Sequence, residues 1–302
     1  ITDPEEKGLE MRSKIGLIHL ELGEYDQAIE VFSSLLAGQP DNGQIRYYLA
    51  IAYEENGDIE EALRQFEAVP SEGPYGVKSR IHRAFIQEKK GDVEGAIAIL
   101  RQVMTDHPDE EDGYLYLGNM YESLDRYAEA EAVLRQGLKM VPDRQQLHFR
   151  LGVVLDKLGE RQGCISEMEK VIALDPNHAN ALNYLGYTLA ELGIRLDEAE
   201  ELIKRALEVK PDDGYITDSL GWVYFKMGRH KDAIVYIQKA LEKLPEDPLI
   251  TEHLGDAYMA VGKWRKAQEA YERALRLGHE NPDQLENKIE KSRKKAHNLK
   301  AP

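Results

Sequence analysis

Small, apolar and polar side chains recur along the chain with a period close to 34 residues. Apolar residues within a period lie three or four apart, as do Leu151 and Leu155 or Met168 and Val171, which is the spacing of one face of a helix. Two small residues, 12 or 13 positions apart, mark each period. The first markers are Gly16, Ala50, Ala84, Gly118, Gly152, Gly186, Gly221 and Gly255, and the second are Ala28, Ala62, Ala96, Ala130, Cys164, Ala199, Ala233 and Ala267. Small residues let helices approach closely, so each period predicts a helix–turn–helix pair.

Turn-forming residues stand at fixed places within the period. A proline expected to end the second helix follows at Pro40, Pro74, Pro108, Pro142, Pro176, Pro211 and Pro245. Glycines expected as left-handed C-caps lie between the two helices at Gly57, Gly91, Gly159, Gly193, Gly228 and Gly262. Acidic or amide residues after the prolines are expected to cap the next helix, namely Asp41, Asp109, Asp143, Asn177 and Asp212.

This pattern resembles the tetratricopeptide repeat (TPR), with the clearest match in Leu220, Gly221, Tyr224, Ala233, Ala240 and Pro245. The resemblance runs from about Leu9 to His279 and implies an all-α fold, a right-handed superhelical α-solenoid whose first helices line a concave groove. We expect eight repeats at 9–42, 43–76, 77–110, 111–144, 145–178, 179–213, 214–247 and 248–281. Residues 1–8 are expected to end a helix or an upstream repeat, and residues 282–302 to form a capping helix and tail.

Charge and hydropathy narrow the function classes. The chain of 302 residues has 39 Lys and Arg against 55 Asp and Glu, a net charge of −16. Phosphate binding depends on Lys and Arg, so a nucleic-acid partner is not expected. No apolar run is long enough for a membrane span. Because the chain starts at Ile1 and not at Met, we expect a processed or trimmed piece of a longer protein.

The sequence contains no pattern typical of an active site. It has no phosphate loop, no HExxH zinc pair and no GxSxG nucleophile elbow. Cys164 occupies a small-residue position and is expected to be a buried thiol, and the acidic residues at the joints lack the order of a calcium loop. The carboxylate clamp of some TPR domains is not supported either, because Asn119 and Arg150 lack the accompanying Lys–Asn pair. We expect a protein that is not an enzyme and needs no cofactor or metal.

Groove positions implied by the resemblance are most aromatic in repeats five to seven. They predict a partner-binding groove made of Phe149, Val153, Asn180, Asn183, Tyr187, Tyr215, Asp218, Trp222 and Phe225. Trp and Tyr dominate binding hot spots, and Asn and Asp can pair with peptide groups. The alternative is that rings such as Trp222 and Phe225 pack between neighbouring first helices as core. The sequence leaves both alternatives open.

Residues 182–258 resemble bacterial periplasmic TPR lipoproteins, including adaptors that deliver substrates to a processing protease. This resemblance favours a scaffold or adaptor for another protein or peptide, in the periplasm or at the outer membrane, with the cytoplasm as the alternative. A different hypothesis is the TPR arm of a longer enzyme, such as a glycosyltransferase or kinase, with its catalytic domain elsewhere. Self-association through the solenoid ends is a third option.

Two local features add expectations. Pro70 predicts an early end to the second helix of repeat two, and with Gly73, Pro74 and Gly76 it indicates a soft joint, either a hinge or a rigid local variation. The final helix carries a basic run from Lys288 to Lys295, which we interpret as a solvated face, with a docking patch for an acidic partner as the alternative.

Overall fold

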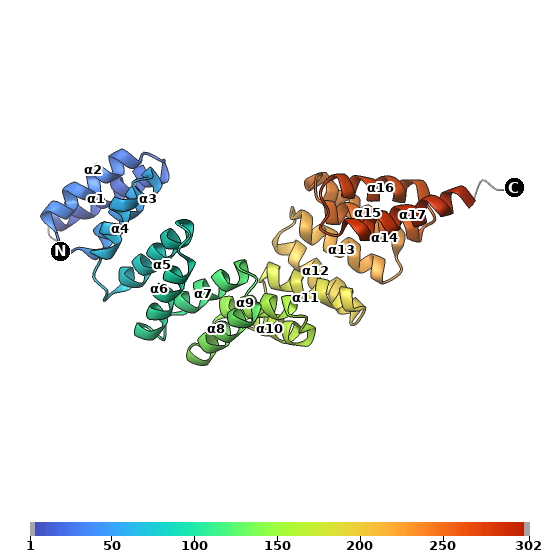
Figure 1. The fold of residues 1–302 in the computed structure, drawn as a ribbon, viewed down its shortest axis with the longest axis horizontal. Coiled ribbons are helices and arrows are strands. Elements are labelled where there is room, and N and C mark those ends of the chain that lie inside the picture. Colours follow the sequence, from blue (N-terminus) through green and yellow to red (C-terminus); the bar gives the residue numbers. More distant parts are fainter. Residues whose placement is uncertain (1–3, 299–302) are drawn as a thin grey trace. The chain divides into compact units, whose positions relative to one another are not determined.

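A computed structural model describes residues 4–298, and these residues form helices joined by short turns, without a strand (Figure 1). The chain divides into two compact units, residues 1–150 and 151–302. The expectations for residues 1–3 and for the tail at 299–302 lie outside the described residues. Residues 4–8 belong to the first helix. The all-α solenoid class is confirmed.

Helices α1 to α9 begin in the first unit, and the boundary between the units falls inside α9. Their bounds are α1 Pro4–Glu21, α2 Tyr25–Gly38, α3 Gly43–Asn56, α4 Ile59–Glu67, α5 Pro74–Lys89, α6 Val93–Asp106, α7 Glu111–Ser123, α8 Tyr127–Met140 and α9 Gln145–Lys157. The second unit continues with α10 Arg161–Leu174, α11 Ala179–Leu192, α12 Leu196–Val209, α13 Gly214–Lys226, α14 His230–Lys243, α15 Pro248–Ala260, α16 Trp264–Arg276 and α17 Pro282–Asn298. Odd-numbered helices up to α15 are the first helices of their pairs.

The two small markers of each period lie where the paired helices touch. A Cβ added to Gly118 would lie 2.8 Å from Leu134, and one added to Gly221 would lie 2.6 Å from Ile237. Both distances are shorter than van der Waals contact, so the first helix needs glycine there to reach its partner. All the second markers, including Cys164, are fully buried.

The turns agree with the sequence in part. All six turn glycines named above have positive φ, including Gly57 at 88° and Gly193 at 67°. The proline markers stand two residues past a second helix, except Pro74, which is the first residue of α5. The caps predicted at Asp41, Asp109, Asp143, Asn177 and Asp212 are wrong, because each next helix begins two residues later. Where a side chain caps the next helix, it belongs to the residue after the predicted one. Asn42 accepts a hydrogen bond from the Ile45 amide and Asp213 accepts one from the Ile216 amide, both at 3.1 Å.

The joint between α4 and α5 is a loop, as Pro70 predicts. Helix α4 has nine residues and ends at Glu67, and residues 68–73 lie outside any helix. Ring contacts nevertheless bridge the joint: Phe66 stacks on His82 at 5.0 Å, and Tyr47 contacts Tyr75 at 5.2 Å. The joint therefore combines an interrupted backbone with a packed aromatic cluster.

We expect residues 66–88 to exchange their amide hydrogens faster than residues 216–241. In a solenoid, stability is approximately a sum of interfaces between neighbouring repeats. A shortened helix followed by a loop therefore lowers the local free energy of opening. Native-state hydrogen exchange with peptide-level mass spectrometry measures both segments in one sample. Equal protection of the two segments would show that the aromatic contacts make the joint a rigid variation and not a hinge.

Candidate protein-binding surface

The first helices of the second unit pack in sequence order, α11 against α13 and α13 against α15. Most of the predicted groove residues lie on α11 and α13, and Val153 lies on α9. Phe149 belongs to the first unit, where it is half-buried. Whether these residues bind a partner stays a prediction, but their exposure in the structure sorts them into two groups.

Five of the predicted residues keep part of their surface accessible on α11 and α13. Tyr215 is 59% exposed, and Asn180 is also exposed, with its Oδ1 accepting from Lys210 Nζ at 2.9 Å. Asn183, Tyr187 and Phe225 are half-buried, as is Val153 on α9. Burial and the nearby Glu191 carboxylate raise the pKa of Tyr187, so its hydroxyl remains protonated. The accessible groups on these two helices are thus aromatic rings and amides.

Tyr215 also borders a cleft of about 320 Å³. The cleft is lined on its other side by the end of α14, the turn after it and the start of α15. These segments contribute the apolar Leu244, Pro245 and Pro248 and the charged Lys243, Glu246 and Asp247. An exposed aromatic ring beside apolar side chains is the arrangement in which a partner's side chain can be enclosed.

Trp222 is buried, which agrees with the core alternative for its ring. It is 8% exposed, because its ring is stacked on Phe225 at 4.8 Å and on His253 at 4.0 Å. Its Nε1 donates a hydrogen bond to Glu191. Trp222 therefore joins α11, α13 and α15.

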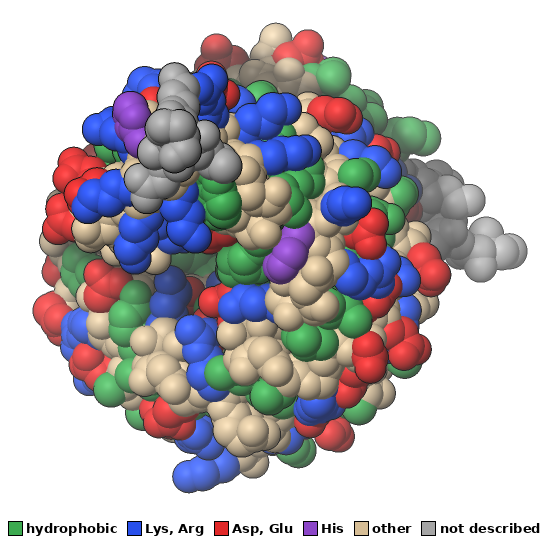
Figure 2. Space-filling view, turned by 90° about the vertical axis from the view of Figure 1, so that its right-hand side faces the viewer, with side chains coloured by type: hydrophobic (Ala, Val, Ile, Leu, Met, Phe, Trp, Pro, Cys, Tyr) green, Lys and Arg blue, Asp and Glu red, His purple; other side chains and the backbone are tan. Residues whose placement is uncertain are grey.

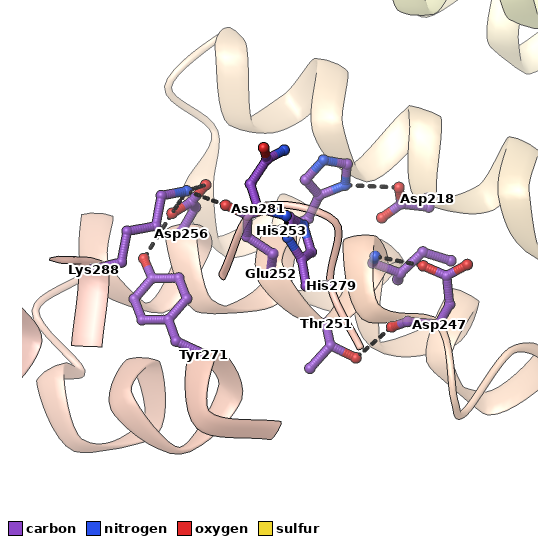
Figure 3. Close-up of polar contacts among 11 residues, drawn as sticks. Asp218, Asp247, Thr251, Glu252, His253, Asp256, Tyr271, His279, Asn281 and Lys288 are labelled. Atoms are coloured by element: carbon purple, nitrogen blue, oxygen red, sulfur yellow. Dashed lines mark hydrogen bonds and ion pairs between the residues drawn. The ribbon is translucent and has the colours of Figure 1, made fainter. Parts of the chain in front are cut away.

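Asp218 is also buried, so it does not offer a free carboxylate to a peptide backbone. It is 5% exposed, and its Oδ2 lies 2.8 Å from His253 Nδ1 on α15 (Figure 3). Burial acts to lower the pKa of His253, but the Asp218 charge and hydrogen bond outweigh it, and the net shift is upward. The Asp218–His253 pair thus contacts Trp222 through the His253 ring.

A second buried network fastens the last helix to α15. Glu252 of α15 contacts His279 Nε2 and Lys288 Nζ, each at 2.7 Å, and Lys288 also reaches Asp256 at 2.7 Å (Figure 3). Tyr271 of α16 donates to Asp256 at 2.6 Å. Burial opposes the charge of Lys288, yet the Asp256 and Glu252 carboxylates raise its pKa overall. Lys288, placed in the solvated run by the sequence interpretation, is instead a structural contact of the cap.

Sequence reasoning missed both networks. Asp218 and His253 stand 35 residues apart, one repeat plus one residue, and this spacing was the available signal for a contact between neighbouring first helices. No comparable spacing identifies the contact of Glu252 with His279, because His279 lies in a turn.

Cys164 is fully buried, as expected, and burial raises the pKa of its thiol to about 11. Across residues 4–298, no group of three or more His, Cys, Asp or Glu side chains is placed to hold a metal ion. None of helices α1 to α17 is long and apolar enough to cross a bilayer.

Known families and structures match this chain as follows. The model of the cilia and flagella-associated protein 70 C-terminal domain matches residues 48–293, and the tetratricopeptide repeat model matches residues 19–75. TPR repeat-containing protein PA4667 of Pseudomonas aeruginosa is 47% identical over 77 residues, which cover 24% of this chain and 13% of that protein.

Two solved structures share the fold at low identity. PilW, a widely conserved type IV pilus biogenesis factor, superimposes with a TM-score of 0.60 at 20% identity, covering 70% of this chain and 99% of its own. A tetratricopeptide repeat protein from Parabacteroides merdae superimposes with a TM-score of 0.57 at 14% identity, covering 95% of this chain and 99% of its own. With a family model matching most of its length, the chain belongs to the tetratricopeptide repeat family, whose members are generally scaffolds for protein–protein interaction.

Proposed function

We propose that this protein holds a partner protein or peptide on the accessible face of α11 and α13 in its second unit. The observation that carries the proposal is Tyr215, a ring that is 59% exposed beside a cleft of mixed polar and apolar lining. Tyr187, Phe225, Val153, Asn180 and Asn183 extend the face, and Trp222 and Asp218 support it from below.

The chemistry of this face suits a peptide. Exposed rings gain by burial against apolar side chains, and amides can pair with the N–H and C=O groups of an extended or helical segment. Asn183 Oδ1 is buried and has no hydrogen-bond partner within the described residues, so it is an acceptor whose hydrogen bond is unmade there. Trp222 contributes by fixing the face, because its ring packs on Phe225.

Tyr215→Ala should weaken partner binding by about 2 kcal/mol, as expected for an interfacial tyrosine hot spot. The wild-type protein, Tyr215→Ala and Val235→Ala are immobilised as baits for extracts of the native organism, and retained proteins are quantified by mass spectrometry. Val235 is a matched control, since it is 48% exposed on the second helix α14. Retention of the same proteins in the same amounts by all three baits would refute the proposed site.

In its finer form, the proposal is an adaptor in the bacterial envelope. It rests on the resemblance of residues 182–258 to periplasmic TPR lipoproteins. A stretch of similar length in this chain, 77 residues, is 47% identical to the bacterial protein PA4667. Fractionation of the native organism tests it: recovery with periplasmic or outer-membrane markers supports the adaptor, and recovery with cytoplasmic markers alone contradicts it.

A further inference from the structure

We propose that a cleft between α16 and α17 binds an acidic peptide segment of a partner protein. Its lining residues are Arg265, Gln268, Glu269, Glu272, Arg293, Ala296 and His297, and its volume is about 450 Å³. This surface is separate from the face around Tyr215 and does not depend on the function proposed for that face.

Charge is distributed unevenly along this acidic chain. Between Lys263 and His297, ten Lys and Arg stand against six Asp and Glu, although the whole chain has a net charge of −16. Figure 2 shows Lys and Arg side chains gathered over the end of the second unit that α17 forms. A local excess of one sign attracts ligands of the opposite sign and raises their association rate.

The cleft is built by two helical faces. Arg265, Gln268, Glu269 and Glu272 follow the spacing of one face of α16, and Arg293, Ala296 and His297 come from the last turns of α17. Helix α17 is held in place by buried contacts elsewhere on its surface, including Leu285, which is fully buried. The cleft is therefore a feature of the packed cap and not of a loose tail.

The cations of the cleft are available to a ligand. Arg265 is exposed and makes no hydrogen bond or ion pair in the part of the chain that the structure describes. The side chain of Arg293 is 57% exposed, and its ion pair with Glu272 is long, at 3.6 Å. Glu272 is held by Gln268, which donates to it at 2.8 Å. A guanidinium group binds a carboxylate with two parallel hydrogen bonds, so each arginine can take one acidic side chain.

The mixed lining favours a peptide over a polyphosphate. Glu269 and Glu272 would repel phosphates, but their oxygens can accept hydrogen bonds from peptide N–H groups. Nucleic acids and anionic membranes present a continuous negative surface, which the rest of this acidic chain repels. A peptide presents separate carboxylates and N–H donors, and both have counterparts in the cleft.

Fluorescence anisotropy with a fluorescein-labelled peptide of repeating Asp-Glu-Leu tests the proposal. The double variant Arg265→Gln/Arg293→Gln should lower the affinity by about tenfold or more, because it removes two charge-assisted contacts. The matched control Lys291→Gln/Lys294→Gln removes the same charge from residues of α17 that do not line the cleft, and it should change affinity by less than about threefold. Tyr215→Ala should bind the peptide as the wild type does, which separates this surface from the face on α11 and α13.

Circular dichroism and the melting temperature establish that each variant is folded. The proposal is overturned if the wild type does not bind the peptide, or if the two double variants lose affinity equally, which would indicate attraction by net charge alone. Tighter binding of duplex DNA or of phosphatidylserine vesicles than of the peptide would also overturn it, in favour of a polyanion site.

Discussion

Trp222→Ala should lower the free energy of unfolding by about 3–5 kcal/mol, the usual cost of removing a large buried ring. The ring is stacked between Phe225 and His253, and its Nε1 donates to Glu191 on the neighbouring first helix. Its removal leaves a cavity at the meeting point of α11, α13 and α15, and it also exposes the layer that contains His253. Because a solenoid depends on contacts between neighbouring repeats, the loss should be concentrated in the second unit.

Chemical denaturation followed by circular dichroism measures this loss. Tyr215→Ala is the matched control, since Tyr215 lies on the same helix with 59% of its surface exposed, and its stability should stay within about 0.5 kcal/mol of the wild type. A loss below about 1 kcal/mol for Trp222→Ala would contradict the buried position of the ring.

The Asp218–His253 pair should make the free energy of unfolding depend on pH. The contribution of His253 should fall with rising pH in the wild type and rise with rising pH in Asp218→Asn. In the wild type the folded pKa of His253 lies above its ordinary value of 6.5. Protonated His253 therefore contributes stability that is fully present below about pH 6.5 and is lost as the pH rises through the folded pKa.

In Asp218→Asn, burial is the main remaining influence on His253 and should move its pKa below the ordinary value. Protonation then costs stability as the pH falls, so the variant should lose about 2 kcal/mol or more relative to the wild type at about pH 6, and less at about pH 9. The charges that raise the pKa of His253 in the wild type are Asp218 from α13, which also bonds to it, and Asp256 and Glu252 from α15.

Denaturation curves of both proteins at each pH, followed by Trp222 fluorescence in a Trp264→Phe background, give the difference directly. Other titrating groups are common to both proteins, so they cancel in the comparison. A difference in stability that is independent of pH would mean that His253 stays neutral in the folded protein.

The fold was predictable because it repeats. Each marker such as Gly221 or Ala233 occurs eight times, and the physical requirement for a small side chain between two helices is the same in every repeat. The N-caps were misplaced by one residue because a proline fixes the end of one helix but not the length of the turn before the next. Asn42 therefore caps where Asp41 was expected.

The candidate site was less predictable, because exposure depends on neighbouring repeats. Position within the repeat placed Trp222 and Tyr215 on the same helix but could not show that His253 of the next repeat covers the Trp222 ring. In the same way, Asp218 has the residue type of a ligand-binding carboxylate, and only its distance to His253 shows a structural pair. Lys288 was assigned to a basic, solvated face because its carboxylate partners lie 32 and 36 residues away.

Site-specific photocrosslinking in the native organism shows whether the face around Tyr215 holds a protein partner. Benzoylphenylalanine replaces Tyr215 in one protein and Val235, on α14, in a second. We expect a partner that is crosslinked from position 215 and not from position 235, and mass spectrometry would identify it. If no protein is crosslinked from position 215, or if the same proteins are crosslinked from both positions, the face around Tyr215 is not the site that holds the partner.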